Sequence, residues 1–412
     1  MCIRDSLKEL LKRHIHPKRI FLYRPVITLT AGKGSAAAES TKPGDLEEAL
    51  LRRLGTLGIV RLKGAAIEIT DLPFDLQDLD FELSQRGRDS PVHRLNIRGK
   101  AGFHGAKIPF ALAGSISADR EKRDRVSGNL TLEVDQLPLN RLPWPRSFFG
   151  KQGTAQVRMD IKGSLSGSIT AKSHIILSKP HFLLTKGKRM QIFSFEELGL
   201  ALELKYQQGS ILSVTSLHLE GPGFTLQAES TMDFRNNSDP RLLLKVRSPS
   251  MPLETFEAIF PTALISPWVE NTLFKALKGG HVKVDLFSLQ GPFSRVGGLG
   301  SRKNASALLL NLSYKGLRIS GPGTPLPFEK ISGKFSVKDG GLTAFDLKSR
   351  FSRSTIRDGL VRIEDLYKER ISCDISLKGS FDLRDLVRLK GSAHIPPKLR
   401  LQIQGLDSAS GK

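Results

Sequence analysis

Alternation of apolar and polar residues, with a period of two, is the feature that most constrains this chain. It runs through four segments: Val157–Lys162, Leu200–Lys205, Val282–Leu286 and Ile371–Lys378. Successive side chains of a strand point to opposite faces, so each segment predicts a strand with one apolar and one polar face. This pattern is typical of antiparallel sheets, because parallel strands covered on both faces read as continuous apolar runs.

Glycine recurs where the alternation stops, often followed by Ser, Pro or another turn residue. Glycine and proline supply turn dihedrals and end a ladder, so these positions predict turns. They are Gly99-Lys100, Gly114-Ser115, Gly163-Ser164, Gly221-Pro222-Gly223, Gly291-Pro292, Gly321-Pro322-Gly323 and Gly379-Ser380. Many short strands, spaced about 8–12 residues apart, predict an all-β, mainly antiparallel protein. They are too many, from Ile20 to Gln404, for one compact sandwich, so we expect an elongated, curved sheet or groove of repeated strand-turn units.

A pair of short helices interrupts the strand pattern. Residues Pro252–Phe260 predict one helix, which ends at Pro261, and Ser266-Pro267 predicts the start of a second one. In the second helix Trp268, Val269, Leu273, Phe274 and Leu277 fall at helical spacing, and Gly279-Gly280 is its predicted stop. A further helix is predicted over Leu46–Leu54.

These landmarks divide the chain into four parts. We expect a partial N-terminal strand unit over 1–43, a first β-groove segment over 44–250, the helical pair over 251–280 and a second β-groove segment over 281–412. Residues 1–6 are unlike native sequence and resemble translated adapter sequence, so we expect the chain to be a fragment of a longer protein.

The chain is strongly basic, with 63 Lys and Arg against 41 Asp and Glu, a formal charge of +22. From Arg141 to Met190 there are ten basic residues and one acid, Asp160. These charges are single and interleaved with apolar residues, which favours a solvated sheet face. An anionic membrane surface is a second candidate partner. Only 2 Trp and 4 Tyr are available for base stacking, so no nucleic acid is expected as a partner.

No motif predicts catalysis, a cofactor or a metal, and we expect a non-enzymatic protein. The nine histidines form no zinc spacing and are interpreted as surface residues: His14, His16, His93, His104, His174, His181, His218, His281 and His394. Gly163–Gly167 places Leu165 where a nucleophile elbow needs serine, and Gly297–Lys303 lacks both the third glycine of a dinucleotide loop and the signature of a P-loop. The two cysteines, Cys2 and Cys373, exclude a disulfide scaffold.

Several of these segments resemble the AsmA-like proteins of Gram-negative bacteria, most closely the large YhdP-type members with an AsmA-like C-terminal region. The resemblance lies in the helical pair with its following strand, Phe256–Val284, and in the strand-turn-strand units at Pro17–Ile27, Leu57–Ile69 and Leu377–Leu383. The helical pair is the more specific signal, because the strand units alone are degenerate.

The resemblance implies a periplasmic protein that shields phospholipid acyl chains in a trough of β-structure. It implies a role in moving phospholipid between the inner and outer membranes and in outer-membrane maintenance, as in bridge-like lipid transfer proteins. In that family an N-terminal helix anchors the protein to the inner membrane, and this sequence contains no such helix.

The alternating strands supply candidate side chains for such a groove, with acyl chains as the partner. The candidates are Met159, Ile161, Leu202, Leu204, Val284, Leu286, Ile375 and Leu377. The alternative is a structural or interaction β-module of the cell envelope, in which sheets pack fully and sheet edges bind partner proteins. A basic polymer-binding protein and an enzyme are the remaining, weaker alternatives.

Overall fold

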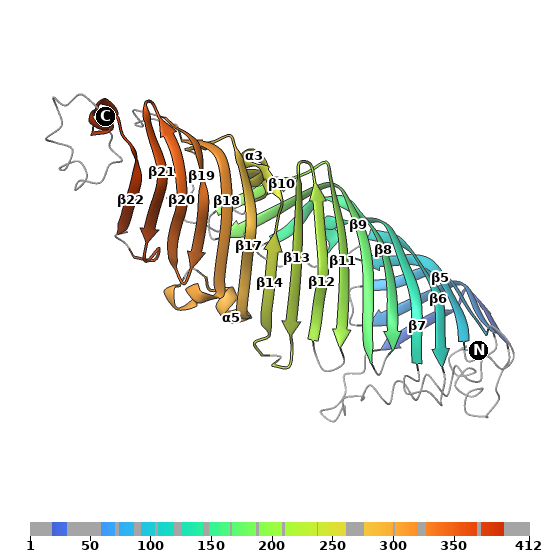
Figure 1. The fold of residues 1–412 in the computed structure, drawn as a ribbon. Coiled ribbons are helices and arrows are strands. Elements are labelled where there is room, and N and C mark those ends of the chain that lie inside the picture. The colour runs from blue at the N-terminus through green and yellow to red at the C-terminus, as the bar shows by residue number, and fades with distance from the viewer. Residues whose placement is uncertain are drawn as a thin grey trace. The chain divides into compact units, whose positions relative to one another are not determined.

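The fold is all-β and mainly antiparallel, as the alternation predicts (Figure 1). The structure, a computed structural model, describes residues 19–30, 59–70, 74–85, 92–103, 106–118, 126–142, 148–164, 167–186, 189–207, 211–236, 238–260, 276–299, 301–319, 327–368 and 372–390. The chain divides into two compact units. The first comprises residues 1–145, 149–181 and 194–215, and the second comprises 146–148, 182–193 and 216–412.

The described residues contain 22 strands. The first eleven are β1 (Arg19–Tyr23), β2 (Val26–Thr30), β3 (Ile59–Thr70), β4 (Phe74–Gln85), β5 (Val92–Phe103), β6 (Ala106–Ala118), β7 (Val126–Pro138), β8 (Phe148–Ser164), β9 (Ser168–Lys186), β10 (Arg189–Ser194) and β11 (Glu197–Gln207). The others are β12 (Ile211–Gly221), β13 (Phe224–Asp233), β14 (Arg241–Arg247), β15 (Ser250–Pro252), β16 (Leu277–Lys278), β17 (His281–Pro292), β18 (Leu308–Ile319), β19 (Phe328–Lys338), β20 (Gly341–Phe351), β21 (Ser354–Ile363) and β22 (Cys373–Ser380).

In the first unit, β3 to β8 pair antiparallel in chain order, and β9 pairs antiparallel with β11. The exception is at β3, with which β1 and β2 both pair in parallel. Between β1 and β2 the strand is interrupted at Arg24, which has a φ of 46°, and at the buried Pro25, and β2 then continues in the same direction along β3. Three of the alternating segments lie in β8, β11 and β17, and the described part of the fourth from Cys373 onward lies in β22.

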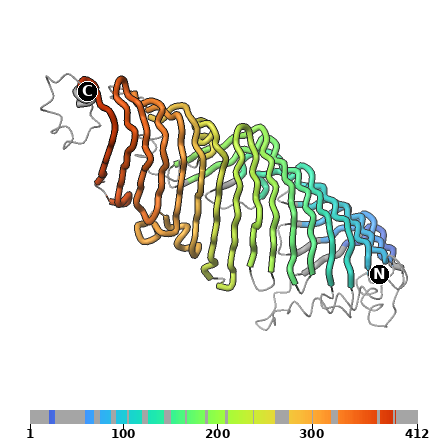
Figure 2. Tube along the Cα trace, in the orientation of Figure 1, coloured from blue at the N-terminus to red at the C-terminus, as the bar shows by residue number. Residues whose placement is uncertain are grey.

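In the second unit, β17 to β22 also pair antiparallel in chain order. On its other side β17 pairs with β14, which pairs with β13, and with β15. The Cα trace in Figure 2 follows these successive hairpins from β17 to β22.

The first predicted helix is confirmed as α3 (Leu253–Ile259), whose Leu253 and Phe256 are buried. Most of the second predicted helix lies outside the described residues, as does the predicted helix at 46–54. Leu277, the last apolar position predicted for the second helix, belongs instead to strand β16, which pairs with β18. The other described helical turns are η1 (Leu139–Arg141), α5 (Phe293–Val296), η4 (Arg302–Ala307) and α6 (Leu383–Lys390).

The turn at Gly221-Pro222-Gly223 is confirmed between β12 and β13, and Gly163, Gly291 and Gly379 lie at strand ends. The turns predicted at Gly99 and Gly114 are wrong, because both glycines lie inside strands, β5 and β6. A Cβ on Gly114 would come 2.0 Å from the Asn129 carbonyl oxygen, and one on Gly99 would come 2.6 Å from Leu79 Cδ2. Glycine here permits a close approach between neighbouring strands instead of ending them. The turn predicted at Gly321–Gly323 lies outside the described residues.

Eleven of the 22 described strands carry a β-bulge or a residue with positive φ within their length. Examples are Gly64 in β3, Asp78 in β4, Gln136 in β7, Lys330 in β19 and Asp346 in β20. A bulge adds one residue to one strand, bends that strand and increases its twist. These eleven strands are therefore bent, and the alternation with a period of two is interrupted at each bulge.

Candidate apolar lipid-binding face

One face of the first unit carries side chains that line up from strand to strand. The cross-strand register joins Leu62, Phe81, Ile97, Leu112, Leu132 and Met159 into one row across β3 to β8. Directly opposite residues in antiparallel strands share a face, with Cβ atoms about 5 Å apart. The row is therefore a continuous apolar band six strands wide, and we call it the first apolar row.

A second row runs beside the first on the same face, two residues away along each strand. It contains Val60, Leu83, Leu95, Gly114, Leu130 and Ile161. Leu83 and Leu95 are its buried centre, and side chains of both rows pack against them. The predicted groove residues Met159 and Ile161 are thus brought together with apolar side chains from five other strands.

The first apolar row stays partly open to solvent. All six of its side chains are half-buried, so none of them is fully sealed from solvent. Apolar side chains in a sandwich core are fully buried at the usual density of protein interiors. A half-buried apolar band of this width presents a surface on which hydrocarbon can lie.

The opposite face of the same strands is charged. Arg61 and Glu82 form an ion pair of 2.9 Å, Arg158 and Glu133 one of 3.6 Å, and Thr131 donates a 2.6 Å hydrogen bond to Asp160. Such exposed pairs contribute about 0–1 kcal/mol each, so their main consequence is a well-hydrated face. The two faces of the first unit therefore differ sharply in polarity.

The apolar face continues over β9 and β11, where Leu202 and Leu204 lie. β9 runs beside β8, because a Cβ on Gly163 would come 2.7 Å from the Ile169 Cα. Counted by alternation from that contact, Ala171 and Ser173 of β9 lie on the same face as Ile161 and Met159. In β11, Leu204 faces Ala171 and Leu202 faces Ser173. Both leucines are half-buried.

The second unit has an apolar face built in the same way. The register joins Val284, Leu312, Phe335, Ala344, Val361 and Ile375 across β17 to β22. The next row has eight members from β13 to β22: Ala228, Val246, Phe287, Leu310, Val337, Leu342, Ile363 and Cys373.

Exposure in this unit increases toward β22. Val284 is buried, the four middle members of its row are half-buried, and Ile375 is 49% exposed. Leu377 is 40% exposed and lies against Gly359, where a Cβ would come 2.9 Å from Leu377 Cδ2. Of the eight predicted residues, all except the buried Val284 are therefore half-buried or exposed.

Leu286 is placed differently from its prediction. Alternation puts it on the face of Val284, but a bulge in β17 makes Asp285 and Leu286 together oppose a single residue, Asn311. Asn311 lies on the polar face, where it accepts a 2.8 Å hydrogen bond from Ser336. Leu286 therefore lies on the polar face, and Phe287 takes the next position on the apolar face.

Sequence reasoning missed most members of the rows, among them Leu112, Leu132, Phe335 and Val361. The signal was available in part, because Ile108, Phe110 and Leu112 alternate within β6. It also missed Tyr314, whose hydroxyl oxygen would lie 2.8 Å from a Cβ on Gly333. Burial raises the pKa of Tyr314 to about 12. The glycine thus makes room for the aromatic ring on the apolar face.

His93 is the clearest departure from the surface position predicted for the histidines. It lies on the apolar face of β5 in register with Gln85 and Ile116, and it is only 1% exposed. Among the described residues, its Nδ1 has no hydrogen-bond partner. Burial lowers the pKa of His93 from its ordinary 6.5, because the charged ring would lose its hydration. His174, His218 and His281 are exposed, as predicted.

Acidification is therefore expected to destabilise the first unit through His93. The unfolded chain binds a proton near pH 6.5, whereas the folded chain binds it only at lower pH. Stability should then fall as pH drops below about 6.5 and stop falling, for this residue, below the lowered folded pKa. Hydrogen exchange of β5 amides at about pH 7.5 and about pH 5.5, corrected for intrinsic rates, measures the difference. His93→Leu should reduce this pH-dependent difference in exchange, and His174→Leu at an exposed position should not. Equal differences in both variants would contradict the role of His93 in the pH dependence.

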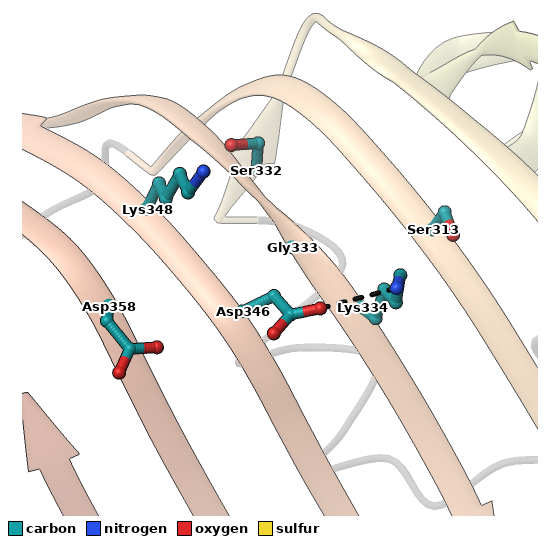
Figure 3. A pocket seen from close by; sticks show the side chains of 7 residues that line it. All are labelled: Ser313, Ser332, Gly333, Lys334, Asp346, Lys348 and Asp358. Carbon is teal, nitrogen blue, oxygen red and sulfur yellow. Dashed lines mark ion pairs between the residues drawn. The ribbon is translucent and has the colours of Figure 1, made fainter.

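A shallow depression of about 350 Å³ lies on the polar face of the second unit (Figure 3). Lys334 and Asp346 form a 3.3 Å ion pair within it, and Lys348 and Asp358 also line it. Two cations and two carboxylates balance in charge, and the side chains are exposed. The depression has no enclosed apolar wall and is separate from the apolar rows.

Within the described ranges, no three or more His, Cys, Asp or Glu side chains gather as ligands for a metal ion. No helix in those ranges has the length and apolar character needed to cross a bilayer. No protein-family model, no curated protein and no solved structure matches this chain.

Proposed function

We propose that this chain is part of a non-enzymatic cell-envelope protein that shields phospholipid acyl chains against its apolar β-face. The observation that carries the proposal is the first apolar row, six side chains wide and half-buried throughout. Burying apolar surface gains about 0.8 kcal/mol per methylene, so a pair of acyl chains gains on the order of 20 kcal/mol before losses of freedom. No specific polar contact is required for such a gain.

The polarity of the two faces supports the same proposal. A conduit must hold hydrocarbon on one side and remain hydrated on the other, and the strands of each unit have this character. The rows also continue from strand to strand without a polar interruption among the pairs from β3 to β8. Acyl chains could therefore lie across several strands, as transport along a protein requires.

By its sequence resemblance we propose that the protein is AsmA-like and acts in the periplasm in phospholipid transport and outer-membrane maintenance. An N-terminal inner-membrane anchor in the full-length protein is part of this proposal. The alternative is a packed structural or interaction module, in which the same faces bury against protein. The half-buried state of the first apolar row favours the lipid-binding function over this alternative.

The test is to purify the chain from a Gram-negative envelope, extract it with organic solvent and identify bound lipid by mass spectrometry. We expect phospholipid in at least equimolar amount, because a half-buried apolar band of this width is costly to leave in contact with water. A folded protein that carries no phospholipid would contradict the proposal and favour the packed module.

A further inference from the structure

The charged face of the first unit has an apolar patch at its β1 edge. Phe21 is 59% exposed, Tyr23 is 69% exposed and Val26 at the start of β2 is 66% exposed. Elsewhere in the described residues, Met190 and Ile192 of β10 are 65% and 51% exposed. Three such residues within six positions of one edge are more than the scattered exposure of a soluble surface.

Cations surround the two aromatic rings. Phe21 is in register with Arg61, and Tyr23 with Lys63, so these pairs share the charged face. The Arg61 guanidinium lies 5.8 Å from the Phe21 ring centroid, and the Arg24 guanidinium lies 5.3 Å from that of Tyr23. Arg24 and Lys63 are themselves exposed. Three carboxylates also lie near this cluster. Glu82 pairs with Arg61 at 2.9 Å, Asp80 accepts a 3.0 Å hydrogen bond from the Gly64 N–H, and Asp78, which pairs with Lys100 at 2.9 Å, also interacts electrostatically with Arg24.

We propose that these residues, Phe21, Tyr23, Arg24, Val26, Arg61 and Lys63, form a docking surface for an anionic lipid bilayer. Aromatic side chains favour the headgroup level of a membrane because one part of the ring system is apolar and its edge tolerates water. A guanidinium stacked on a ring still presents donors that match a phosphate, and a nearby ammonium adds attraction to an anionic surface.

This proposal does not depend on the lipid-binding function. The patch lies on the face opposite the first apolar row, as the pairing of Arg61 with Glu82 and of Leu62 with Phe81 requires. One surface would bind the bilayer from outside, whereas the other would hold single lipid molecules. The two can therefore fail separately.

The experiment is sedimentation of the full chain with vesicles of phosphatidylcholine alone and with added phosphatidylglycerol. We expect binding only to the anionic vesicles, weakened by salt. Arg24→Ala with Lys63→Ala should reduce binding about 30-fold, since each cation near an anionic surface contributes a factor of about five. Phe21→Ser with Tyr23→Ser should reduce it about tenfold or more by removing the apolar anchors. These side chains are exposed, so both variants should fold.

Two control variants match these changes elsewhere. Arg357→Ala with Arg362→Ala removes two exposed cations from β21, and Met190→Ser with Ile192→Ser removes two exposed apolar residues from β10. Both should bind anionic vesicles like the unchanged chain. The proposal is overturned if the controls lose as much binding as the patch variants, if binding ignores phosphatidylglycerol, or if the patch variants lose binding to single-stranded DNA while still binding vesicles.

The same set of proteins separates this proposal from the lipid-binding one. The patch variants should keep their extracted phospholipid, measured by mass spectrometry, while losing vesicle binding. Loss of extracted lipid with vesicle binding retained would instead point to a fault in the apolar face alone.

Discussion

Replacing Leu112 with aspartate is expected to strip the protein of copurifying phospholipid, whereas the same replacement at the neighbouring Ala113 is expected to leave the lipid in place. Leu112 is half-buried in the middle of the first apolar row, in register with Ile97 and Leu132. A carboxylate there must stay hydrated or pay a desolvation cost against hydrocarbon, so bound lipid should fall about tenfold or more. Mass spectrometry of organic extracts measures the phospholipid per protein.

Ala113 is the matched control because it is exposed on the polar face of the same strand, in register with Asn96 and Thr131. A second variant, Met159→Asp at the β8 end of the row, guards against a local effect at Leu112. Circular dichroism verifies that each variant retains its strands. Equal lipid content in the Leu112→Asp, Met159→Asp and Ala113→Asp proteins would show that the first apolar row is not the binding surface.

Removing the Asp385 carboxylate is expected to destabilise the second unit by about 3 kcal/mol. A single oxygen, Asp385 Oδ2, accepts hydrogen bonds from the Arg353 N–H at 2.9 Å, the Ser354 N–H at 3.1 Å and the Ser354 hydroxyl at 2.9 Å. Asp385 is 2% exposed and Ser354 is fully buried. Asp385→Ala leaves these donors without their acceptor, and water reaches them poorly. The measurement is the free energy of unfolding in urea, followed by hydrogen exchange of the β20–β21 turn.

The same contacts tie α6 to the β20–β21 turn. The Asp382 N–H donates to the Ser354 hydroxyl at 3.0 Å, and the turn packs on Phe351, which lies 5.0 Å from Phe328 and 6.3 Å from Phe381 between ring centroids. Asp374→Ala on the exposed strand β22 is the control and should change stability by less than about 0.5 kcal/mol. An Asp385→Ala protein as stable as this control would mean that the network contributes nothing.

The pKa of Asp385 gives the sign of its pH dependence. Burial raises this pKa, but hydrogen bonds from Ser354, Ser352 and the backbone N–H groups outweigh it, so the pKa lies below the ordinary 3.8. The stabilisation is therefore complete well above pH 3.8 and is lost as pH falls through the lower folded value. In the Asp385→Ala protein this loss should be absent.

Alternation in the sequence was sufficient to predict the strands and their two-faced character. Val157–Lys162 and Leu200–Lys205 have no bulge within them, so counting by two placed Met159, Ile161, Leu202 and Leu204 on one face. What alternation could not supply is the partner of each strand. The parallel pairing of β1 and β2 with β3 depends on residues more than thirty positions apart, and no local pattern encodes it.

The wrong predictions at Gly114 and Leu286 arise because a glycine and a bulge act through neighbouring strands. Gly114 looks like a turn residue in sequence, but its role is to let the Asn129 carbonyl approach. Leu286 continues an alternating pattern in sequence, but an extra residue in β17 turns it to the other face. His93 alternates with Leu95 and Ile97 in sequence, which places it on the apolar face, and its register with Ile116 accounts for its burial.

The bulge in β17 divides that strand into two parts, in which residues of opposite numbering, even and then odd, face the apolar side. Before it the even-numbered residues Val282 and Val284 face the apolar side, and after it the odd-numbered residues Phe287 and Leu289 do. The one extra residue in β17 therefore returns the later apolar side chains to the apolar face. Deletion of one residue elsewhere in the strand would move every later side chain to the opposite face of the sheet. Replacement of one apolar residue by another leaves each side chain on its own face. In such a sheet, whether the number of residues between two bulges is odd or even matters more than which apolar residues occupy those positions.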